Sequence, residues 1–434
     1  MGKLKNFFRS LGPGVITGAA DDDPSGIATY SQAGAQFGTG VLWFALFQYP
    51  LMSAIQEMCA RIGLITGAGL GSAIKNQFSK RTVIPLTSLL LIANTINIGV
   101  DIGAMAAATK LITPQLPVFA IALCFTGLIV TTEILVPYKK YSRILRYLTF
   151  SLFAYVITAA IVGGNISEIF LSSVIPHVEA SPEFVMMFVA LFGTTISPYL
   201  FFWQTSEEAE EDVVSHKIRD IGDGAPKITK SDIKTMRLDI GIGMAFSQMI
   251  MWFIILTAAG TLYQNGITNI TTADDAAKAL EPLVKTFPYS GEASKIIFAL
   301  GIIGTGLLAV PVLAGSSAYA LADGFGWKEG LCKKFRQAKA FYLSIMVSTG
   351  IGLVINFVEI SPITALIYAA VINGIIAVPM LFAIMKIANN RKILQDRING
   401  KISNILGWIT FGLMSVSVLV MLAFFVVPKI VKLV

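Results

Sequence analysis

The sequence predicts an all-α integral membrane protein that forms one transmembrane domain over residues 1–434. Three observations support this prediction. The chain is 55% hydrophobic and only 14% charged, whereas an average soluble protein is about 25% charged. Apolar stretches of about 20 residues, long enough to span a bilayer, recur along the whole chain. Two of these stretches are interrupted by a proline among polar residues, a pattern typical of the discontinuous helices of secondary transporters.

The first stretch, 12–38, is apolar on both sides of Asp21-Asp22-Asp23-Pro24-Ser25-Gly26. A charge near the bilayer centre costs at least about 2.5 kcal/mol, so carboxylates at this depth usually face a cavity and serve an ion or substrate. The proline removes a backbone donor and the Ser-Gly pair adds flexibility, and both favour a broken helix. We therefore expect the first span to be discontinuous.

Ten further spans follow in order. They are expected at 41–62, 84–112, 117–136, 147–165, 184–208, 238–263, 293–322, 340–358, 362–387 and 404–428. Span six contains Gly193-Thr-Thr-Ile-Ser197-Pro198-Tyr199, which again places a proline among hydroxylated residues.

The two breaks open spans one and six. This spacing favours a leucine-transporter-like 5+5+1 arrangement, with inverted repeats at about 12–166 and 184–388 and an eleventh helix at 404–428. Ordinary proline kinks, which membrane helices tolerate, are the alternative. The three aspartates at the first break favour the discontinuous helix.

Loop charge predicts the orientation. Of the 33 Lys and Arg residues, 26 lie in segments on the side of the N-terminus, whereas the outer loops 166–183 and 264–292 hold only Lys278 and Lys285. The basic segments are 1–11, 63–83, 137–146, 209–237, 323–339 and 386–401. By the positive-inside rule, the N-terminus is cytoplasmic and the C-terminus lies outside the cell membrane. The basic residues that give the net charge of +7 therefore serve to orient the protein in the lipid bilayer, and nucleic acid is not expected as a partner.

Other functional classes lack their motifs. There is no G-x-x-x-x-G-K-[ST] sequence for ATP-driven pumping, no H-E-x-x-H metalloprotease motif, and no Ser/His/Asp arrangement for hydrolysis. The three cysteines are scattered, which indicates neither a disulfide framework nor a zinc site. We expect a secondary transporter without a cofactor rather than an enzyme. A channel, which would conduct without coupling, is the main rival.

At this point the sequence resembles a known family. LGPGVITGAADDDPSGIATYSQAGAQFG resembles the first helix of the NRAMP (natural resistance-associated macrophage protein) metal transporters, which have an Asp-Pro-Gly-Asn break. Glu57 to Arg61 with Gly63-Leu-Ile-Thr-Gly67 is similar to their second span, and GTTISPYLFFWQ stands where the family has a Met-Pro-His break. The resemblance covers all eleven spans and implies alternating access by a leucine-transporter-like fold.

The resemblance also implies a substrate site. Asp23 matches the metal-binding aspartate, and Thr194 matches a position whose backbone carbonyl serves as a ligand, so these two are the expected metal ligands. Gly26 replaces the family's Asn, Ser197 its metal-binding Met and Tyr199 its His. The chain is therefore expected to be a divergent relative of these transporters.

Three further residues complete the predicted site. Asp101 falls at an acidic proton-pathway position, and Asn373 is the amide nearest to a usual Gln. Ser25 adds a hydroxyl at the break. Because adjacent helical residues point about 100° apart, the three aspartates of the break cannot all face one ion if helical. We assign Asp22 and Asp101 to coupling with H⁺ or Na⁺.

The residues leave two substrates open. With Ser197 in place of a thioether, the site has only oxygen ligands, which favours a hard divalent cation such as Mg²⁺ or Mn²⁺. The alternative is a small oxyanion such as bicarbonate, held by the N-terminal ends of the half-helices after Pro24 and Pro198 and by nearby hydroxyls.

Two charged patterns outside the breaks have simpler interpretations. The acidic run Ser206-Glu-Glu-Ala-Glu-Glu-Asp212 is expected to be a solvated face, with a cation vestibule as the alternative. Glu57 and Arg61, four residues apart, are expected to form a structural ion pair.

Overall fold

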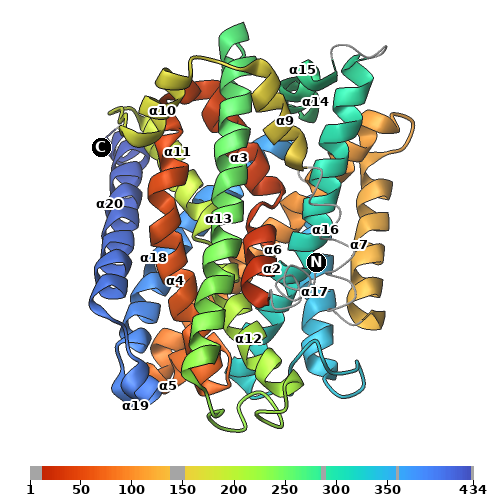
Figure 1. The fold of residues 1–434 in the computed structure, drawn as a ribbon. Coiled ribbons are helices and arrows are strands. Elements are labelled where there is room, and N and C mark those ends of the chain that lie inside the picture. The colour runs from red at the N-terminus through yellow and green to blue at the C-terminus, as the bar shows by residue number, and fades with distance from the viewer. Residues whose placement is uncertain (1–11, 137–151, 285–289, 358–360, 432–434) are drawn as a thin grey trace, which may run out of the picture.

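The computed structural model describes residues 12–136, 152–284, 290–357 and 361–431, and all regular structure in these ranges is helical. Figure 1 shows most long helices aligned along one axis of the molecule. The helices at the expected spans are α2 (Pro13–Asp21), α3 (Pro24–Phe37), α4 (Trp43–Thr66), α6 (Lys80–Ile112), α7 (Val118–Leu135), α9 (Phe153–Val162), α11 (Pro182–Thr195), α12 (Pro198–Val214), α13 (Lys230–Thr261), α16 (Ser290–Phe325), α17 (Lys339–Ile355), α18 (Pro362–Ala388) and α20 (Lys401–Val431). The predicted all-α class is confirmed.

Short helices connect these elements. They are α5 (Leu70–Gln77), α10 (Ile166–Val174), α14 (Ala273–Ala277), α15 (Glu281–Val284) and α19 (Arg391–Leu394), with 3₁₀ turns η1 (Gly38–Val41), η3 (Tyr263–Asn265), η4 (Lys278–Leu280) and η5 (Gln395–Arg397).

Several helices are long enough to span a membrane. Within the described ranges, seven helices are long and apolar enough to cross a membrane, and an eighth candidate is the pair Pro24–Val41 and Trp43–Thr66, which is bent by 107°. The chain is therefore a multi-pass membrane protein. The count of eleven spans, the inverted repeat and the single-domain boundary stay predictions, and part of the span expected at 147–165 lies outside the described residues.

The first span is broken where the sequence predicts. Helix α2 ends at Asp21, and Asp22 (φ −83°, ψ 51°) and Asp23 (φ −69°, ψ 174°) leave helical geometry. Helix α3 then begins at Pro24. Proline suits the first helical position because its missing N–H would have no intrahelical acceptor there. The polar residues of the break are thus placed between two helix ends.

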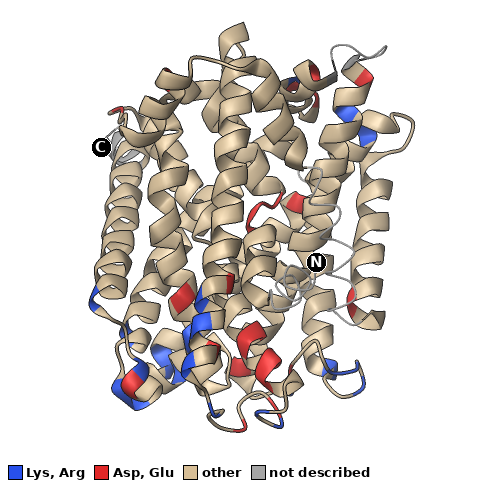
Figure 2. Ribbon diagram, in the orientation of Figure 1, with Lys and Arg blue, Asp and Glu red and all other residues tan. Residues whose placement is uncertain are grey.

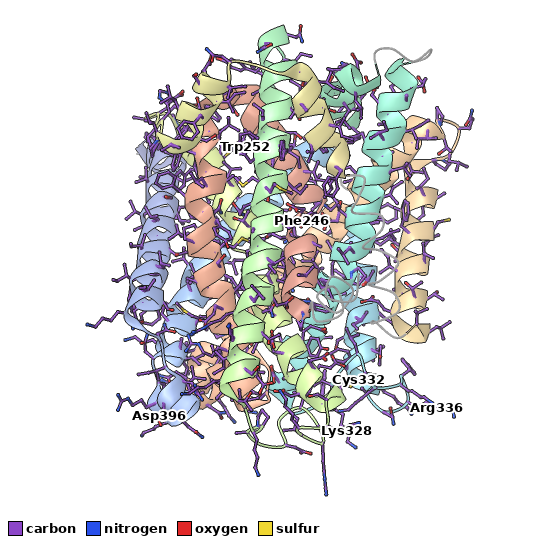
Figure 3. All side chains as sticks on the ribbon, in the orientation of Figure 1. Phe246, Trp252, Lys328, Cys332, Arg336 and Asp396 are labelled. Carbon is purple, nitrogen blue, oxygen red and sulfur yellow. The ribbon has the colours of Figure 1, made fainter. Side chains whose placement is uncertain are left out.

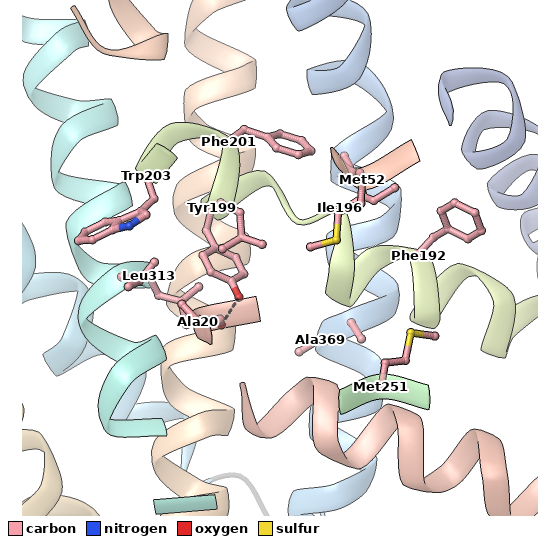
Figure 4. Packing of buried hydrophobic residues seen from close by; sticks show 14 of the residues in the cluster. Ala20, Met52, Phe192, Ile196, Tyr199, Phe201, Trp203, Met251, Leu313 and Ala369 are labelled. Atoms are coloured by element: carbon pink, nitrogen blue, oxygen red, sulfur yellow. Dashed lines mark hydrogen bonds between the residues drawn. The ribbon is translucent and has the colours of Figure 1, made fainter. Parts of the chain in front are cut away.

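The second break repeats this local chemistry. Helix α11 ends before Ile196 (φ −108°, ψ 57°), Ser197 is extended (φ −85°, ψ 138°), and α12 begins at Pro198. Figure 4 shows Leu313 of α16 near Tyr199 and Trp203 of α12, and Met52 of α4 near Ile196. These side chains are buried. The break is therefore enclosed by apolar groups, which strengthens electrostatic interactions inside it.

Helix α13 holds α2 in place from one side (Figure 1). A Cβ atom on Gly18 would overlap the backbone carbonyl of Gly243, so the two helices touch through backbone atoms. The Asp239 carboxylate of α13 also accepts hydrogen bonds from the N–H groups of Gly12 (2.8 Å) and Gly14 (2.6 Å). These bonds satisfy donors that the start of a helix leaves free.

Charged residues are distributed unevenly along the molecule. Figure 2 shows most Lys and Arg at the end where α13 and α20 begin, and a small acidic group at mid-height around the first break. Among the described residues, Arg61 is the only buried Lys or Arg. It bonds Glu57 at 3.1 Å, which confirms the predicted ion pair.

Candidate functional site

The Asp23 carboxylate is fixed by the start of its own helix. Its Oδ1 accepts hydrogen bonds from the Ser25 hydroxyl (2.6 Å) and the Gly26 N–H (2.7 Å). Aspartate is among the preferred N-cap residues because its side chain satisfies these free donors. The same side chain therefore caps α3 and places a buried carboxyl group at the break, since Asp23 is only 1% exposed.

The two helix breaks contact each other directly. The Tyr199 hydroxyl of α12 donates a hydrogen bond to the Ala20 carbonyl of α2 at 3.0 Å (Figure 4). A Cβ atom on Gly26 would lie 3.3 Å from Thr194 Oγ1 and 3.2 Å from the Asp21 carbonyl oxygen. Any larger residue at this position would press against the second break, so glycine sets the spacing between them.

Ser197 and Thr194 contribute oxygen atoms from the second break. The Ser197 hydroxyl is turned back toward α11, within hydrogen-bond distance of the carbonyls of Gly193 (2.5 Å) and Thr194 (2.8 Å). The Thr194 carbonyl, the expected ligand atom, is thus an acceptor for Ser197. Thr194 Oγ1 is buried and has no hydrogen-bond partner among the described residues.

Asp21 and Asp22 face α13. The Ser247 hydroxyl of α13 lies 2.5 Å from Asp21 Oδ2 and 3.5 Å from Asp22 Oδ1. The other oxygens of the two carboxylates, Asp21 Oδ1 and Asp22 Oδ2, are buried without a partner in the part of the chain that the structure describes. The three adjacent aspartates therefore have two different sets of neighbours. Asp23 bonds the first turn of α3, whereas Asp21 and Asp22 lie beside Ser247 of α13.

Two further predicted site residues come from other helices, Asp101 from α6 and Asn373 from α18. Asp101 of α6 is fully buried, close enough to Asp23 for the two charges to interact. Neither of its carboxylate oxygens has a hydrogen-bond partner within the described ranges. Asn97, one turn earlier on the same face of α6, donates to Asn373 Oδ1 at 2.8 Å. Asn373 is thereby placed about one helical turn from Asp101.

These residues form an oxygen-rich, acidic centre. Asp21, Asp22, Asp23 and Asp101 are all buried in or beside the first break, and Figure 2 shows no Lys or Arg at this height near the break. Nowhere in the described residues do three or more His, Cys, Asp or Glu converge as a metal site. A cation here would therefore combine carboxylate with hydroxyl, carbonyl and amide oxygens, which are ligands that hard cations accept.

The sequence did not indicate two participants, Ser247 and Tyr30. Ser247 reaches the aspartates from 225 residues away in the sequence. Tyr30 is fully buried one turn beyond Gly26, and its hydroxyl has no partner in the described part of the chain. A serine and a tyrosine inside apolar spans were weak signals, because single polar residues often only bond their own helix.

The interpretation of the acidic run 206–212 as a solvated face was wrong for three of its five carboxylates, whereas Glu211 is exposed and Glu207 partly exposed. Glu208, Glu210 and Asp212 are at most 6% exposed. Glu208 accepts from Gln204 (2.9 Å), Glu210 from the Tyr319 hydroxyl and the Cys332 N–H, and Asp212 pairs with Lys217 (3.1 Å). The physical reason is tertiary, because α12 packs against α4 on one side and α16 on another, and these three carboxylates lie on the packed sides.

The fold and the centre define a class of protein. A multi-pass helical protein with two discontinuous helices meeting at a buried polar centre has the architecture of a secondary transporter. The family model described as Natural resistance-associated macrophage protein-like matches residues 14–424. The chain therefore belongs to the Nramp family.

Known proteins are similar along nearly the whole chain. The "Divalent metal cation transporter MntH" of Yersinia enterocolitica is 24% identical over 92% of this chain and 90% of its own length. The protein of the same name from Pectobacterium carotovorum is 24% identical over 90% and 88%. Among solved structures, a mutant of the Eremococcus coleocola manganese transporter has a TM-score of 0.72 at 16% identity, and the alignment covers 96% of this chain and 87% of the transporter.

A more distant structure shares the fold as well. Mhp1, a nucleobase-cation-symport-1 family transporter, aligns with a TM-score of 0.59 at 13% identity, covering 96% of this chain and 93% of its own. These structural likenesses concern the fold alone.

Proposed function

We propose that this protein is a secondary-active, alternating-access transporter of a hard divalent cation, Mg²⁺ or Mn²⁺. One observation carries the proposal. Three buried carboxylates with unpartnered oxygens, those of Asp21, Asp22 and Asp101, lie at or beside the first helix break, and no buried Lys or Arg accompanies them in the described ranges. Buried charges are normally paired or bind metal ions. The relatives named as divalent metal cation transporters support the same substrate class.

The cation ligands are proposed as follows. Asp23 supplies the charge and Thr194 a carbonyl or hydroxyl oxygen, and both contact the metal. Ser25, Gly26, Ser197, Tyr199 and Asn373 line the substrate site. The absence of a thioether at Ser197 removes the soft ligand that favours transition metals, so discrimination against Mg²⁺ is weak.

Coupling is assigned to a second set of carboxylates. Asp22 beside Ser247, and Asp101 on α6, are separate from the Asp23 cap yet close to the centre. We propose that they bind the H⁺ or Na⁺ that moves with the substrate. The basic end of the molecule is proposed to face the cytoplasm, with the N-terminus inside and the C-terminus outside.

The oxyanion alternative makes opposite electrostatic demands. Bicarbonate would have to enter an acidic centre that has no buried Lys or Arg beside it among the described residues, so no opposite charge would offset the cost of burying an anion. No observation in the structure favours this substrate. It remains an outcome that the experiment below can return.

Proteoliposomes containing the full chain test the proposal. Uptake of Mn²⁺ and Mg²⁺ should saturate with concentration and respond to an imposed H⁺ or Na⁺ gradient, and Asp23→Asn should abolish it. Asp396→Asn is the matched control, since Asp396 is an exposed aspartate far from the breaks (Figure 3). Bicarbonate-dependent alkalinisation of the lumen without divalent uptake would refute the proposed substrate, and flux that neither saturates nor couples would indicate a channel.

A further inference from the structure

A second polar cavity lies at the basic end of the molecule, away from the helix breaks. It has a volume of about 770 Å³ and opens between α4, α13 and the start of α20. Its lining includes Ser53 and Glu57 of α4, Arg237 of α13 and Lys401 of α20. Because α20 begins its apolar span at Lys401, the cavity sits where that span enters the membrane.

The cavity carries an excess of positive charge. The Glu57 carboxylate is already held by two guanidinium groups, Arg61 at 3.1 Å and Arg237 at 2.9 Å. The Arg237 side chain nevertheless stays 58% exposed, so its remaining N–H groups face the opening. Lys401 is exposed and forms no ion pair with any described residue. Among the lining residues, the two cations Arg237 and Lys401 outnumber the single carboxylate Glu57, which leaves an attraction for an anion.

Neutral donors add to this attraction. The first turn of α20, including Lys401, Ile402 and Ser403, lines the cavity, and the first N–H groups of a helix have no intrahelical acceptor. Oxygen atoms of a phosphate group satisfy such N–H donors.

An apolar stripe leads away from the cavity along α20. Ile402, Ile405 and Ile409 are 75%, 59% and 45% exposed, respectively, and their spacing of three and four residues places them on one face. A free inorganic anion would make no use of this stripe. A phospholipid would bury an acyl chain against it while its headgroup occupied the cavity.

We propose that this cavity binds the phosphate headgroup of an anionic phospholipid from the cytoplasmic leaflet, with one acyl chain lying along the isoleucine stripe of α20. Basic pockets between membrane helices on the cytoplasmic side are suited to such headgroups. The site is independent of the transported ion. It links α4, which follows the first break, to α13, which holds α2, so an occupied cavity stabilises the packing around the transport centre.

Lipid binding to the purified full chain tests the proposal. Phosphatidylglycerol added to the detergent-solubilised protein should raise the thermal unfolding midpoint, and native mass spectrometry should retain a bound phosphatidylglycerol; phosphatidylcholine should do neither. Arg237→Gln combined with Lys401→Gln should weaken the apparent affinity about 30-fold. The matched control is Lys328→Gln with Arg336→Gln, which removes the same charge from exposed residues of the same end (Figure 3).

Three outcomes would overturn the inference. Equal weakening by both pairs of substitutions would mean that only the general surface charge attracts lipid. An equal stabilisation by millimolar inorganic phosphate would assign the cavity to a free anion. If the double variant does not fold, Lys401→Gln alone serves, because this exposed side chain makes no ion pair among the described residues. It should weaken binding about fivefold, and unchanged binding would refute the site.

Discussion

Replacing Asp23 by Asn or by Ala separates the two roles that the structure gives this side chain. Asn keeps an oxygen that can accept from the Ser25 hydroxyl and the Gly26 N–H, so the N-cap of α3 survives. Ala removes the cap as well, which typically costs about 1 kcal/mol. The loss of the carboxylate charge is the change that the two variants share, and the loss of the cap is specific to Ala. We therefore expect Asp23→Asn to unfold close to the wild-type temperature and Asp23→Ala to unfold about 1 °C lower.

The effect on transport should be much larger than the effect on stability. Two unit charges 4 Å apart interact by about 4 kcal/mol at an effective dielectric constant of about 20. A divalent cation that contacts Asp23 would lose at least this much when the carboxylate becomes an amide. Both variants should thus lose about a thousandfold or more in apparent affinity for Mn²⁺ and Mg²⁺.

Calorimetric titration of both ions, beside uptake into proteoliposomes, measures this loss. Asp396→Asn should match the wild type in both assays, because it makes the same chemical change at an exposed position. The reasoning would be refuted by near wild-type uptake in Asp23→Asn. A loss of transport in Asp23→Ala alone would show that the cap matters and the charge does not.

Four other predictions address selectivity, coupling, packing and orientation. Ser197→Met should shift preference toward Mn²⁺ and Cd²⁺ by restoring a polarizable sulfur; an unchanged ratio of Mn²⁺ to Mg²⁺ uptake would remove this residue from the site. Asp101→Asn should leave divalent binding largely intact but weaken the dependence of flux on the H⁺ or Na⁺ gradient. Gly18→Ala should lower the unfolding temperature by about 1 to 3 °C because its Cβ would overlap the backbone of α13, whereas Gly412→Ala, with open space around it, should not. In a background without the native cysteines, Lys230→Cys should react with impermeant reagents only from the cytoplasmic side and Lys278→Cys only from outside, and the reverse labelling would contradict the orientation.

The sequence determined the class of protein and the location of its breaks because both depend on local chemistry. Span length and low charge follow from the thickness and polarity of the bilayer. Pro24 and Pro198 stand among polar residues at the breaks, whereas Pro50, Pro85, Pro311 and Pro379 lie inside continuous helices, so the polar neighbours distinguish the breaks. Aspartates beside the first of them had to cap a helix end or serve an ion, and Asp23 caps one. The Glu57–Arg61 pair was equally local, since four residues on a helix bring the side chains together.

Only the tertiary structure decided which side chains meet. Tyr199 reaches the carbonyl of Ala20 across 179 residues, and Ser247 lies beside Asp21 across 226 residues; no periodicity in one sequence encodes such pairs. The acidic run shows the same limit in reverse, because its composition is that of a solvated helix while α4 and α16 enclose α12. Burial is set by the neighbours that a segment acquires on folding, and those neighbours come from distant parts of the chain.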